Sequence, residues 1–316
     1  YRTGGYAGMT RLTRRTILKL GAGAGALTAT GTLPLSAFAN TDQLVERKIP
    51  SSGETVPIIG LGTNRYGVGD DAAAREPLLA SLARFAELGG TLVDTAPSYR
   101  SSEIVLGDLI SKLGIRDQLF IATKIDKETL QESEAQMRAS LDRLQVERVD
   151  LMQIHNLRGW QDNIRLLRAW KESEQTRYTG ITTSRSAQYA ELEVIIAEHE
   201  LDFLQVNYSL EQREAADRLL PLAADRGMAV IINRAFGGGR IFEAVGDRPV
   251  PDWAREFDCN SWAQFLLKYA LSHPAATLAI PGMTKVHHVD DNMQAGRGRM
   301  PDAAQRKAME QFYDAL

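Results

Sequence analysis

Four polar residues close or follow short apolar runs of this 316-residue chain. They are Asp94 and Tyr99 in VDTAPSY, Lys124 in FIATK and His155 in VDLMQIH. A carbonyl group that accepts hydride also needs a proton on its oxygen, and a tyrosine can donate one. A lysine ammonium nearby lowers the tyrosine pKa, an aspartate keeps that lysine charged, and a histidine can orient the carbonyl. Together the four residue types indicate a site for reducing a carbonyl group.

Each of the four residues alone also fits an ordinary structural role. An aspartate such as Asp94 commonly caps a helix or turn. Lys124 could be solvated at a strand end, and His155 could be a satisfied residue of the core. Tyr99 alone is typical of packing. The functional interpretation therefore depends on finding the four types at the ends of consecutive strand-like runs.

The elements that must position these residues alternate from about Ile49 onward. Apolar runs typical of buried strands cover residues 58–63, 91–94, 119–124, 149–155, 178–182, 203–207, 228–233 and 277–280. Helical periodicity covers residues 77–87, 136–144, 164–170, 187–197 and 261–271. Parallel strands need crossover helices, and eight such units close a barrel with a filled interior. The sequence predicts a single-domain (β/α)8 TIM barrel of the α/β class over residues 40–316.

An open doubly wound sheet is the alternative fold. It normally carries a glycine fingerprint between its first strand and a helix. The segment GLGTNR, residues 60–65, lacks the third glycine and opens no helix. The barrel is therefore favoured.

The composition limits which partners the chain can bind and which disulfides or metal sites it can form. A net charge of −3, with 44% hydrophobic and 24% charged residues, is typical of a soluble globular protein and implies no nucleic-acid partner. The single cysteine, Cys259, excludes an intramolecular disulfide and a cluster of zinc-binding thiolates. His287 and His288 have no carboxylate or thiolate at ligand spacing, so no metal site is predicted.

Residues 1–39 have the pattern of an export signal. TRRTILK, residues 13–19, is a twin-arginine motif, and a Gly/Ala-rich apolar stretch and the small-x-small site Ala37-Phe38-Ala39 follow it. The pattern resembles a twin-arginine translocation signal, which implies export of the folded protein by the translocase to the periplasm. A membrane anchor is the alternative, but the stretch is shorter than about twenty apolar residues and is diluted by Gly and Thr, so no stable insertion is expected.

The motifs from about Ile49 to Asn292 resemble those of the aldo-keto reductase family. VDTAPSY, VDLMQIHN, FLQVNYS and IPGMTKVHHVDDN are similar to successive segments of that family. The resemblance implies a barrel that binds NADPH without a Rossmann domain and reduces a small aldehyde or ketone to an alcohol. It also implies that Tyr99 is the general acid, that Lys124 and Asp94 tune it, and that His155 orients the carbonyl.

The resemblance also implies a set of cofactor-binding residues, with some departures. The set is Thr182, Thr183, Gln205, Asn233, Arg234, Lys285, His288 and Asn292. Thr182-Thr183 stands where the family usually has Ser-Asn, and Asn233 stands where many members have a tyrosine that stacks on the nicotinamide. His288 stands where many members have an arginine for the 2′-phosphate of NADP, so the preference between NADP and NAD stays open.

Two other functions use the same residues. A lysine on a barrel strand is also a feature of Schiff-base lyases of the aldolase type, in which Lys124 would attack the carbonyl. A non-catalytic protein that senses a nucleotide could be built on the same fold. The physiological substrate and the oligomeric state have no signal in the sequence.

Overall fold

Eight parallel strands carry the predicted site residues, in a computed structural model that describes Tyr1 and residues 43–316. The predicted export signal, residues 1–39, lies outside the described residues apart from Tyr1. The eight parallel strands are β3 (Leu61–Gly62), β4 (Leu92–Asp94), β5 (Phe120–Ile125), β6 (Val149–His155), β7 (Thr176–Thr182), β8 (Phe203–Asn207), β9 (Ala229–Asn233) and β10 (Leu278–Ala279). Two further strands, β1 (Glu46–Lys48) and β2 (Thr55–Pro57), form a separate antiparallel hairpin. The hydrogen-bonded order runs from β3 to β10 without interruption.

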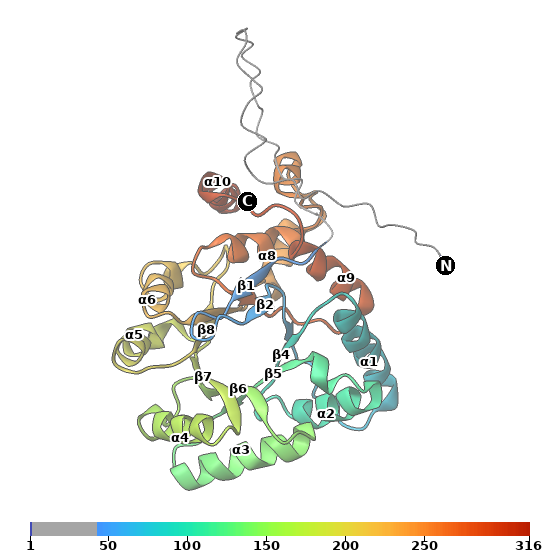
Figure 1. Ribbon diagram of the computed structural model, residues 1–316. Coiled ribbons are helices and arrows are strands. Elements are labelled where there is room, and N and C mark those ends of the chain that lie inside the picture. Colours follow the sequence, from blue (N-terminus) through green and yellow to red (C-terminus); the bar gives the residue numbers. More distant parts are fainter. Residues whose placement is uncertain (2–42) are drawn as a thin grey trace. The chain divides into compact units, whose positions relative to one another are not determined.

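The helices form a ring outside the strands (Figure 1). They are α1 (Ala72–Glu87), α2 (Ser102–Leu113), α3 (Leu130–Leu144), α4 (Trp160–Glu172), α5 (Tyr189–Glu198), α6 (Leu219–Asp225), α7 (Arg240–Val245), α8 (Trp262–Ser272), α9 (Val286–Ala295) and α10 (Ala303–Asp314). Five short 3-10 helices join them: η1 (Arg116–Gln118), η2 (Ser186–Gln188), η3 (Glu214–Ala216), η4 (Gly237–Gly239) and η5 (Asp252–Phe257).

The two ends of the sheet meet. Parallel bridges join Ile59 to Ala279 and Gly62 to Gly282, which closes the sheet into a barrel. The predicted (β/α)8 barrel is confirmed, and the open doubly wound alternative is wrong. All eight predicted strand segments are present, although only Leu61 and Gly62 of the first run form a strand. The helices of the parallel units cover the outside, so these strands are buried and read as continuous apolar runs.

Helix boundaries follow local capping chemistry. The Thr129 side chain accepts a hydrogen bond from the Glu132 amide at the start of α3, and the Ser261 side chain accepts one from the Gln264 amide at the start of α8. Such caps satisfy amide groups that the first helical turn leaves without partners. Gly114 ends α2 with φ 65°, a left-handed conformation that glycine adopts without steric cost.

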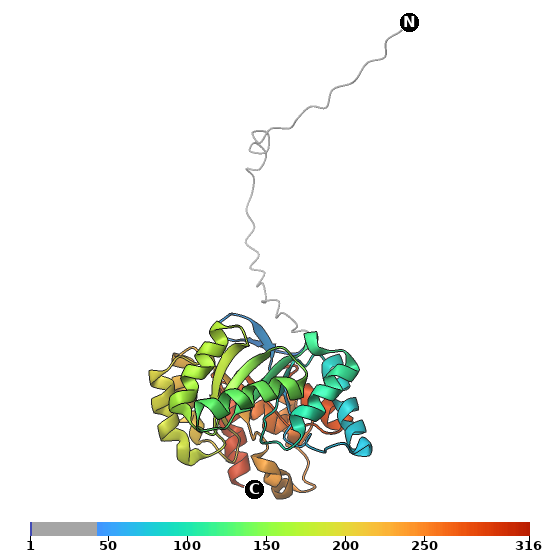
Figure 2. The same cartoon turned by 90° about the horizontal axis from the view of Figure 1, so that it is seen from below.

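The barrel interior has an apolar layer beneath a polar one. Leu92, Phe120, Leu151, Tyr178 and Phe203 pack together with Ile49 and Val56 from the segment around β1 and β2. The β1–β2 hairpin lies across the end of the barrel at which the strands begin, and Figure 2 shows it at the opposite end from α10. Because side chains alternate along a strand, the inward positions that follow Leu92 on β4, Ala122 on β5 and Leu151 on β6 are Asp94, Lys124 and Gln153. The apolar layer therefore supports the predicted site from below.

Within residues 43–316, the helices are too short or too polar for any of them to cross a bilayer.

Candidate active site

The ends of β4, β5 and β6 bring the predicted residues together. Asp94 and His155 are the last residues of β4 and β6, and Lys124 is one residue from the end of β5. Tyr99 lies in the loop between β4 and α2. In parallel sheets the carboxyl ends of neighbouring strands lie about 4.8 Å apart, so these side chains share one small volume.

Asp94 and Lys124 form a buried ion pair. The Lys124 Nζ lies 2.6 Å from Asp94 Oδ2 and also donates to the Thr95 carbonyl at 2.8 Å. Lys124 is fully buried and Asp94 is 2% exposed. Burial has the largest single effect and lowers the pKa of Lys124, but the charges and hydrogen bonds of Asp94 and Tyr99 together outweigh it and leave that pKa raised. Lys124 is therefore an ammonium at neutral pH.

The other oxygen of Asp94 has two amide donors. Gln153 Nε2 donates to Asp94 Oδ1 at 3.2 Å, and Gln205 Nε2 donates to the same atom at 2.9 Å. A buried carboxylate is stable only when its lone pairs are satisfied, and here both oxygens are. Gln153 was not among the predicted site residues. The signal for it was its position two residues before His155, which places both side chains on one face of β6.

Tyr99 lies against both Lys124 and His155. The Lys124 Nζ is 5.1 Å from the centre of the Tyr99 ring, and the Tyr99 and His155 rings meet edge to face with centres 6.0 Å apart. Burial raises the pKa of Tyr99, and the Lys124 charge lowers it by less, so the pKa stays above its usual value. The sequence indicates the effect of the lysine on this pKa but not the effect of burial, because the fold sets how far Tyr99 is buried. Tyr99 therefore keeps its proton at neutral pH and can donate it.

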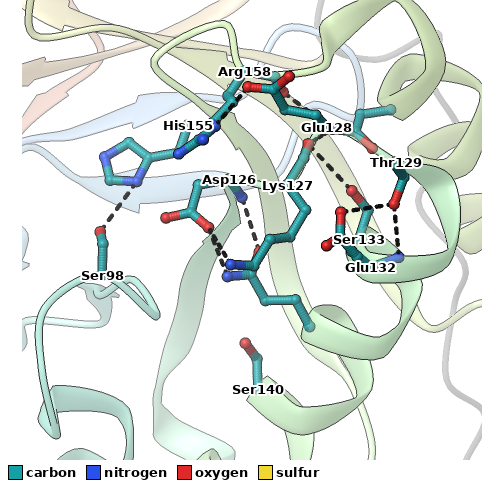
Figure 3. A network of polar contacts seen from close by, with 12 residues as sticks. Ser98, Asp126, Lys127, Glu128, Thr129, Glu132, Ser133, Ser140, His155 and Arg158 are labelled. Carbon is teal, nitrogen blue, oxygen red and sulfur yellow. Dashed lines mark hydrogen bonds and ion pairs between the residues drawn. The ribbon is translucent and has the colours of Figure 1, made fainter.

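His155 is neutral at physiological pH. Burial is the main cause that lowers its pKa to about 4, and the charge of Lys124 adds to the effect. Ser98, which precedes Tyr99, places its hydroxyl 3.3 Å from His155 Nδ1 (Figure 3). This contact leaves Nε2 as the nitrogen that can face a substrate. Ser98 was not predicted, because its reach to His155 depends on the turn after β4.

Turns that contain non-glycine residues with positive φ follow three of the site residues in the chain. Arg100, Asn156, Leu157 and Arg234 have φ between 51° and 58°. They come directly after Tyr99, His155 and Asn233. L-amino acids adopt this left-handed region at a cost on the order of 1 kcal/mol each, and such strain collects at functional sites. The turns direct the chain away from the barrel and leave the three side chains at its mouth.

The predicted cofactor residues fall into two groups. Around the tetrad, Thr182 Oγ1 donates to Gln205 Oε1 at 3.2 Å, and Thr183 Oγ1 donates to Gln188 Oε1 at 2.5 Å. Asn233 and Arg234 follow at the end of β9. Lys285 and His288 are exposed at the start of α9, and Asn292 is buried further along that helix. These two groups of residues lie at the ends of different strands. A ligand that contacts both groups must therefore be extended.

Three buried amide oxygens at the site have no hydrogen-bond partner among the described residues. They are Gln153 Oε1, Asn207 Oδ1 and Asn233 Oδ1. Asn207 and Asn233 are register partners on β8 and β9, so their oxygens lie on neighbouring strand ends beside Gln205. An unsatisfied buried acceptor costs about 1–3 kcal/mol unless a ligand or water supplies a donor. This corner therefore suits a ligand that bears N–H or O–H groups.

A cleft of about 820 Å³ lies at the other end of the barrel. Its lining includes Pro50, Asp202 and Gly227 and none of the tetrad. Lys171 and Asp202 of this cleft pair with each other at 2.7 Å, so two of its charges are already satisfied. The cleft therefore does not include the group of residues predicted to protonate a carbonyl oxygen.

We expect two partly buried histidines to make the fold sensitive to acid. Burial is the largest cause that lowers the pKa of His155 and of His273 to about 4, below the usual value of 6.5. Between pH 6.5 and 4 the unfolded chain binds more protons, so stability is present above pH 6.5 and is lost as the pH falls toward 4. Each histidine should contribute on the order of 2 kcal/mol over this window. Urea unfolding at pH 7.5, 6 and 5 measures the effect, and His273→Gln should flatten the slope. Equal slopes for the variant and the parent would contradict this account.

Comparison with known proteins places the chain. The model of the Aldo/keto reductase family matches residues 58–313. Methylglyoxal reductase YeaE of Escherichia coli (strain K12) is 27% identical over 255 residues, covering 78% of this chain and 88% of that protein. The NADH-specific methylglyoxal reductase of the same organism is 24% identical over 249 residues, covering 66% and 73%. The crystal structure of an aldo-keto reductase from Klebsiella pneumoniae in complex with NADPH is similar with a TM-score of 0.69 at 23% identity, covering 85% and 96%. The match over most of the barrel shows that this chain belongs to the aldo/keto reductase family.

Proposed function

We propose that this protein reduces aldehyde or ketone carbonyls to alcohols with a nicotinamide cofactor. The observation that carries the proposal is the buried Lys124–Asp94 pair beside the Tyr99 ring, with a neutral His155 packed edge to face against that ring. Family membership supports an oxidoreductase acting on carbonyl groups. The reduced nicotinamide, when bound, supplies a hydride to the carbonyl carbon.

The residues of the chain supply the proton and the orientation. The His155 Nε2 faces the site because Ser98 takes Nδ1, so its N–H can donate to the carbonyl oxygen. As negative charge develops on that oxygen, the Tyr99 hydroxyl transfers its proton to it. The Lys124 ammonium stabilises the phenolate that remains, and Asp94 holds that ammonium in place at 2.6 Å. The product is a neutral alcohol, and solvent returns a proton to Tyr99.

The unpartnered amide oxygens fit a nicotinamide carboxamide. Asn207 Oδ1 and Asn233 Oδ1 are buried acceptors without donors among the described residues, and a carboxamide offers two N–H groups. The hydroxyls of Thr182 and Thr183 are engaged with Gln205 and Gln188. Arg234 and Lys285 offer cations to a diphosphate or ribose phosphate. We therefore assign Asn207 and Asn233 to the nicotinamide end of the cofactor and Lys285, His288 and Asn292 to its adenosine end.

The choice between NADPH and NADH should depend on His288. Burial and the neighbouring His287 and Lys285 lower the pKa of His288, so its imidazole loses its charge as the pH rises. A charged imidazole binds the 2′-phosphate and a neutral one does so weakly. His288→Arg should tighten NADPH binding about tenfold at pH 8 and less at pH 6, with NADH unchanged. Fluorescence titration with both nucleotides measures this. An equal gain for NADH, which lacks the phosphate, would sink the assignment.

The direct test of the function combines binding and turnover. Titration with NADPH and NADH should quench protein fluorescence, and one of them should reduce members of a panel of aldehydes. A protein that binds nucleotide without turning over any aldehyde would be the sensing alternative. A protein that binds neither nucleotide would refute the proposal.

The lyase alternative is less well supported by the site. A Schiff base needs a neutral lysine amine, and Lys124 is held as an ammonium by Asp94 at 2.6 Å. Treatment with borohydride and a carbonyl compound separates the two functions. Covalent labelling of Lys124 would favour the lyase.

We also propose that the protein is exported folded through the twin-arginine translocase, with its nucleotide already bound. The support is the TRRTILK motif, the apolar stretch after it and the Ala37-Phe38-Ala39 site. Replacing Arg14 and Arg15 by lysine should keep the protein in the cytoplasmic fraction, and the exported form should begin near Asn40. Rapid loss of nucleotide on dialysis of the exported protein would contradict loading before export.

A further inference from the structure

Two positive charges near the tetrad lack a carboxylate partner among residues 43–316, although the whole chain has a net charge of −3. Asp94 and Lys124 cancel each other, and Lys127 lies 3.9 Å from Asp126. Arg185 and Arg234 have no carboxylate within 4.0 Å anywhere in residues 43–316. Both are exposed at the ends of strands, after β7 and β9. An unpaired guanidinium at the mouth of a site attracts an anion.

The chain fixes Arg185 beside His155. The register pairs His155 with Thr182, three residues before Arg185. The Asn156 side chain accepts hydrogen bonds from the Ser184 amide at 3.1 Å and the Ser184 hydroxyl at 3.4 Å. Gln188 Nε2 donates to the Asn156 carbonyl at 3.0 Å. These bonds join the turn after His155 to the turn that carries Arg185. Its guanidinium is close enough to contribute to the lowered pKa of His155, after burial and Lys124.

A carboxylate stands on the opposite side of His155. Asp126 follows β5, and its Oδ1 accepts from Gln136 Nε2 at 2.7 Å, which fixes its side chain (Figure 3). Because β6 lies between β5 and β7, His155 has Asp126 on one side and Arg185 on the other. A negatively charged group on a substrate held by His155 is repelled from the first side and attracted to the second. The site is therefore polarised along the direction in which a substrate would extend.

The position of Arg185 points to the substrate and not to the cofactor. Under the proposed function His155 contacts the carbonyl oxygen, so a charge next to His155 faces the substituents of that carbonyl. The phosphates of a dinucleotide are separated from the nicotinamide by a ribose. Arg234, beyond Asn233, remains available to them.

We propose that the preferred substrate is an oxo acid, an aldehyde or ketone that carries a carboxylate, and that Arg185 binds this carboxylate. The inference rests on the proposed function. A guanidinium can hold a carboxylate through two parallel N–H bonds, and this fork also sets the direction of the carbonyl. Arg185 then determines specificity without taking part in proton or hydride transfer.

Matched pairs of substrates test the proposal. 4-Oxobutanoate is compared with its methyl ester, and 4-carboxybenzaldehyde with methyl 4-formylbenzoate, since each pair differs in one charge. The wild-type kcat/KM should be at least tenfold higher for the acid of at least one pair, and the excess should shrink as the salt concentration rises. Arg185→Gln should raise the KM for that acid about tenfold or more, with kcat and the KM of the ester within twofold. Arg185→Lys should recover part of the loss.

Two further variants serve as controls. Arg168→Gln removes one positive charge from α4, at the cleft on the other end of the barrel, and should leave both KM values unchanged. Asp126→Asn should lower the KM of the acid and not that of the ester. Nucleotide affinity, measured by fluorescence, should be the same in Arg185→Gln and in the wild type.

The outcomes separate this inference from the function itself. If neither acids nor esters are reduced while nucleotide binds, the proposed reductase function fails. If esters are reduced as well as acids, or if Arg185→Gln affects both equally, the reductase stands and the oxo-acid inference is overturned.

Discussion

Tyr99→Phe is expected to lower kcat by about 10²–10⁴-fold while the affinity for nucleotide changes by less than twofold. The reason is that the ring keeps its contacts with Lys124 and His155, at 5.1 Å and 6.0 Å, and only the proton donor is lost. Because burial keeps the pKa of Tyr99 above its usual value, wild-type turnover should hold across neutral pH and fall only in alkaline solution. The residual turnover of Tyr99→Phe should not show this fall in alkaline solution. Steady-state rates from pH 6 to pH 11 measure both effects.

A matched control for this variant exists in the chain. Tyr66 is fully buried, and its hydroxyl donates to the Met283 carbonyl at 3.0 Å. Tyr66→Phe removes one hydroxyl outside the tetrad and should reduce stability by about 1 kcal/mol with little change in kcat. If Tyr99→Phe reduced aldehydes at the wild-type rate, the general acid would have to be another group. The proposed mechanism would then be wrong.

Lys124→Met is expected to have the largest combined effect on stability and turnover. It leaves the Asp94 carboxylate buried with only the amides of Gln153 and Gln205, and breaking a buried pair in this way costs about 3–5 kcal/mol. Turnover should fall at least about 100-fold, because no ammonium stabilises the Tyr99 phenolate. Urea unfolding and steady-state kinetics measure the two losses separately.

The double variant Lys124→Met with Asp94→Asn separates the causes. Removing both charges should recover at least half of the lost stability, because no unpaired charge remains in the interior. Activity should stay as low as in the single variant. If the double variant regained turnover together with stability, the pair would be only a structural element of the barrel.

The strand order could be predicted because the barrel strands are buried on both faces. Residues 120–125 and 149–154 are apolar or buried throughout, so their runs show without any alternation. The β1–β2 hairpin was not predicted. Its strands have three residues each, and Glu46–Lys48 consists of three charged residues with no apolar pattern. Its place in the fold comes from Ile49 and Val56, which pack on an apolar layer assembled from several strands.

Some contacts within the site could likewise be predicted from the sequence, and others could not. The types and order of Asp94, Lys124 and His155 follow from the sequence, since a residue at a strand end in a parallel barrel points to the common mouth. The engagement of Thr182 and Thr183 by Gln205 and Gln188 did not follow from it, because these hydrogen bonds join separate strands and turns. Ser98 likewise meets His155 across 57 positions of the chain.

The sequence by itself determined the barrel, the four residues of the tetrad and the family to which they point, because these depend on local pattern and on the order of segments. Tertiary structure alone decided the charge states and the balance of charges. Burial sets the pKa values of Tyr99 and His155, and burial is a property of the packed barrel. The unpaired Arg185 beside His155 is also a product of folding, because its isolation depends on where every carboxylate of the described barrel comes to lie.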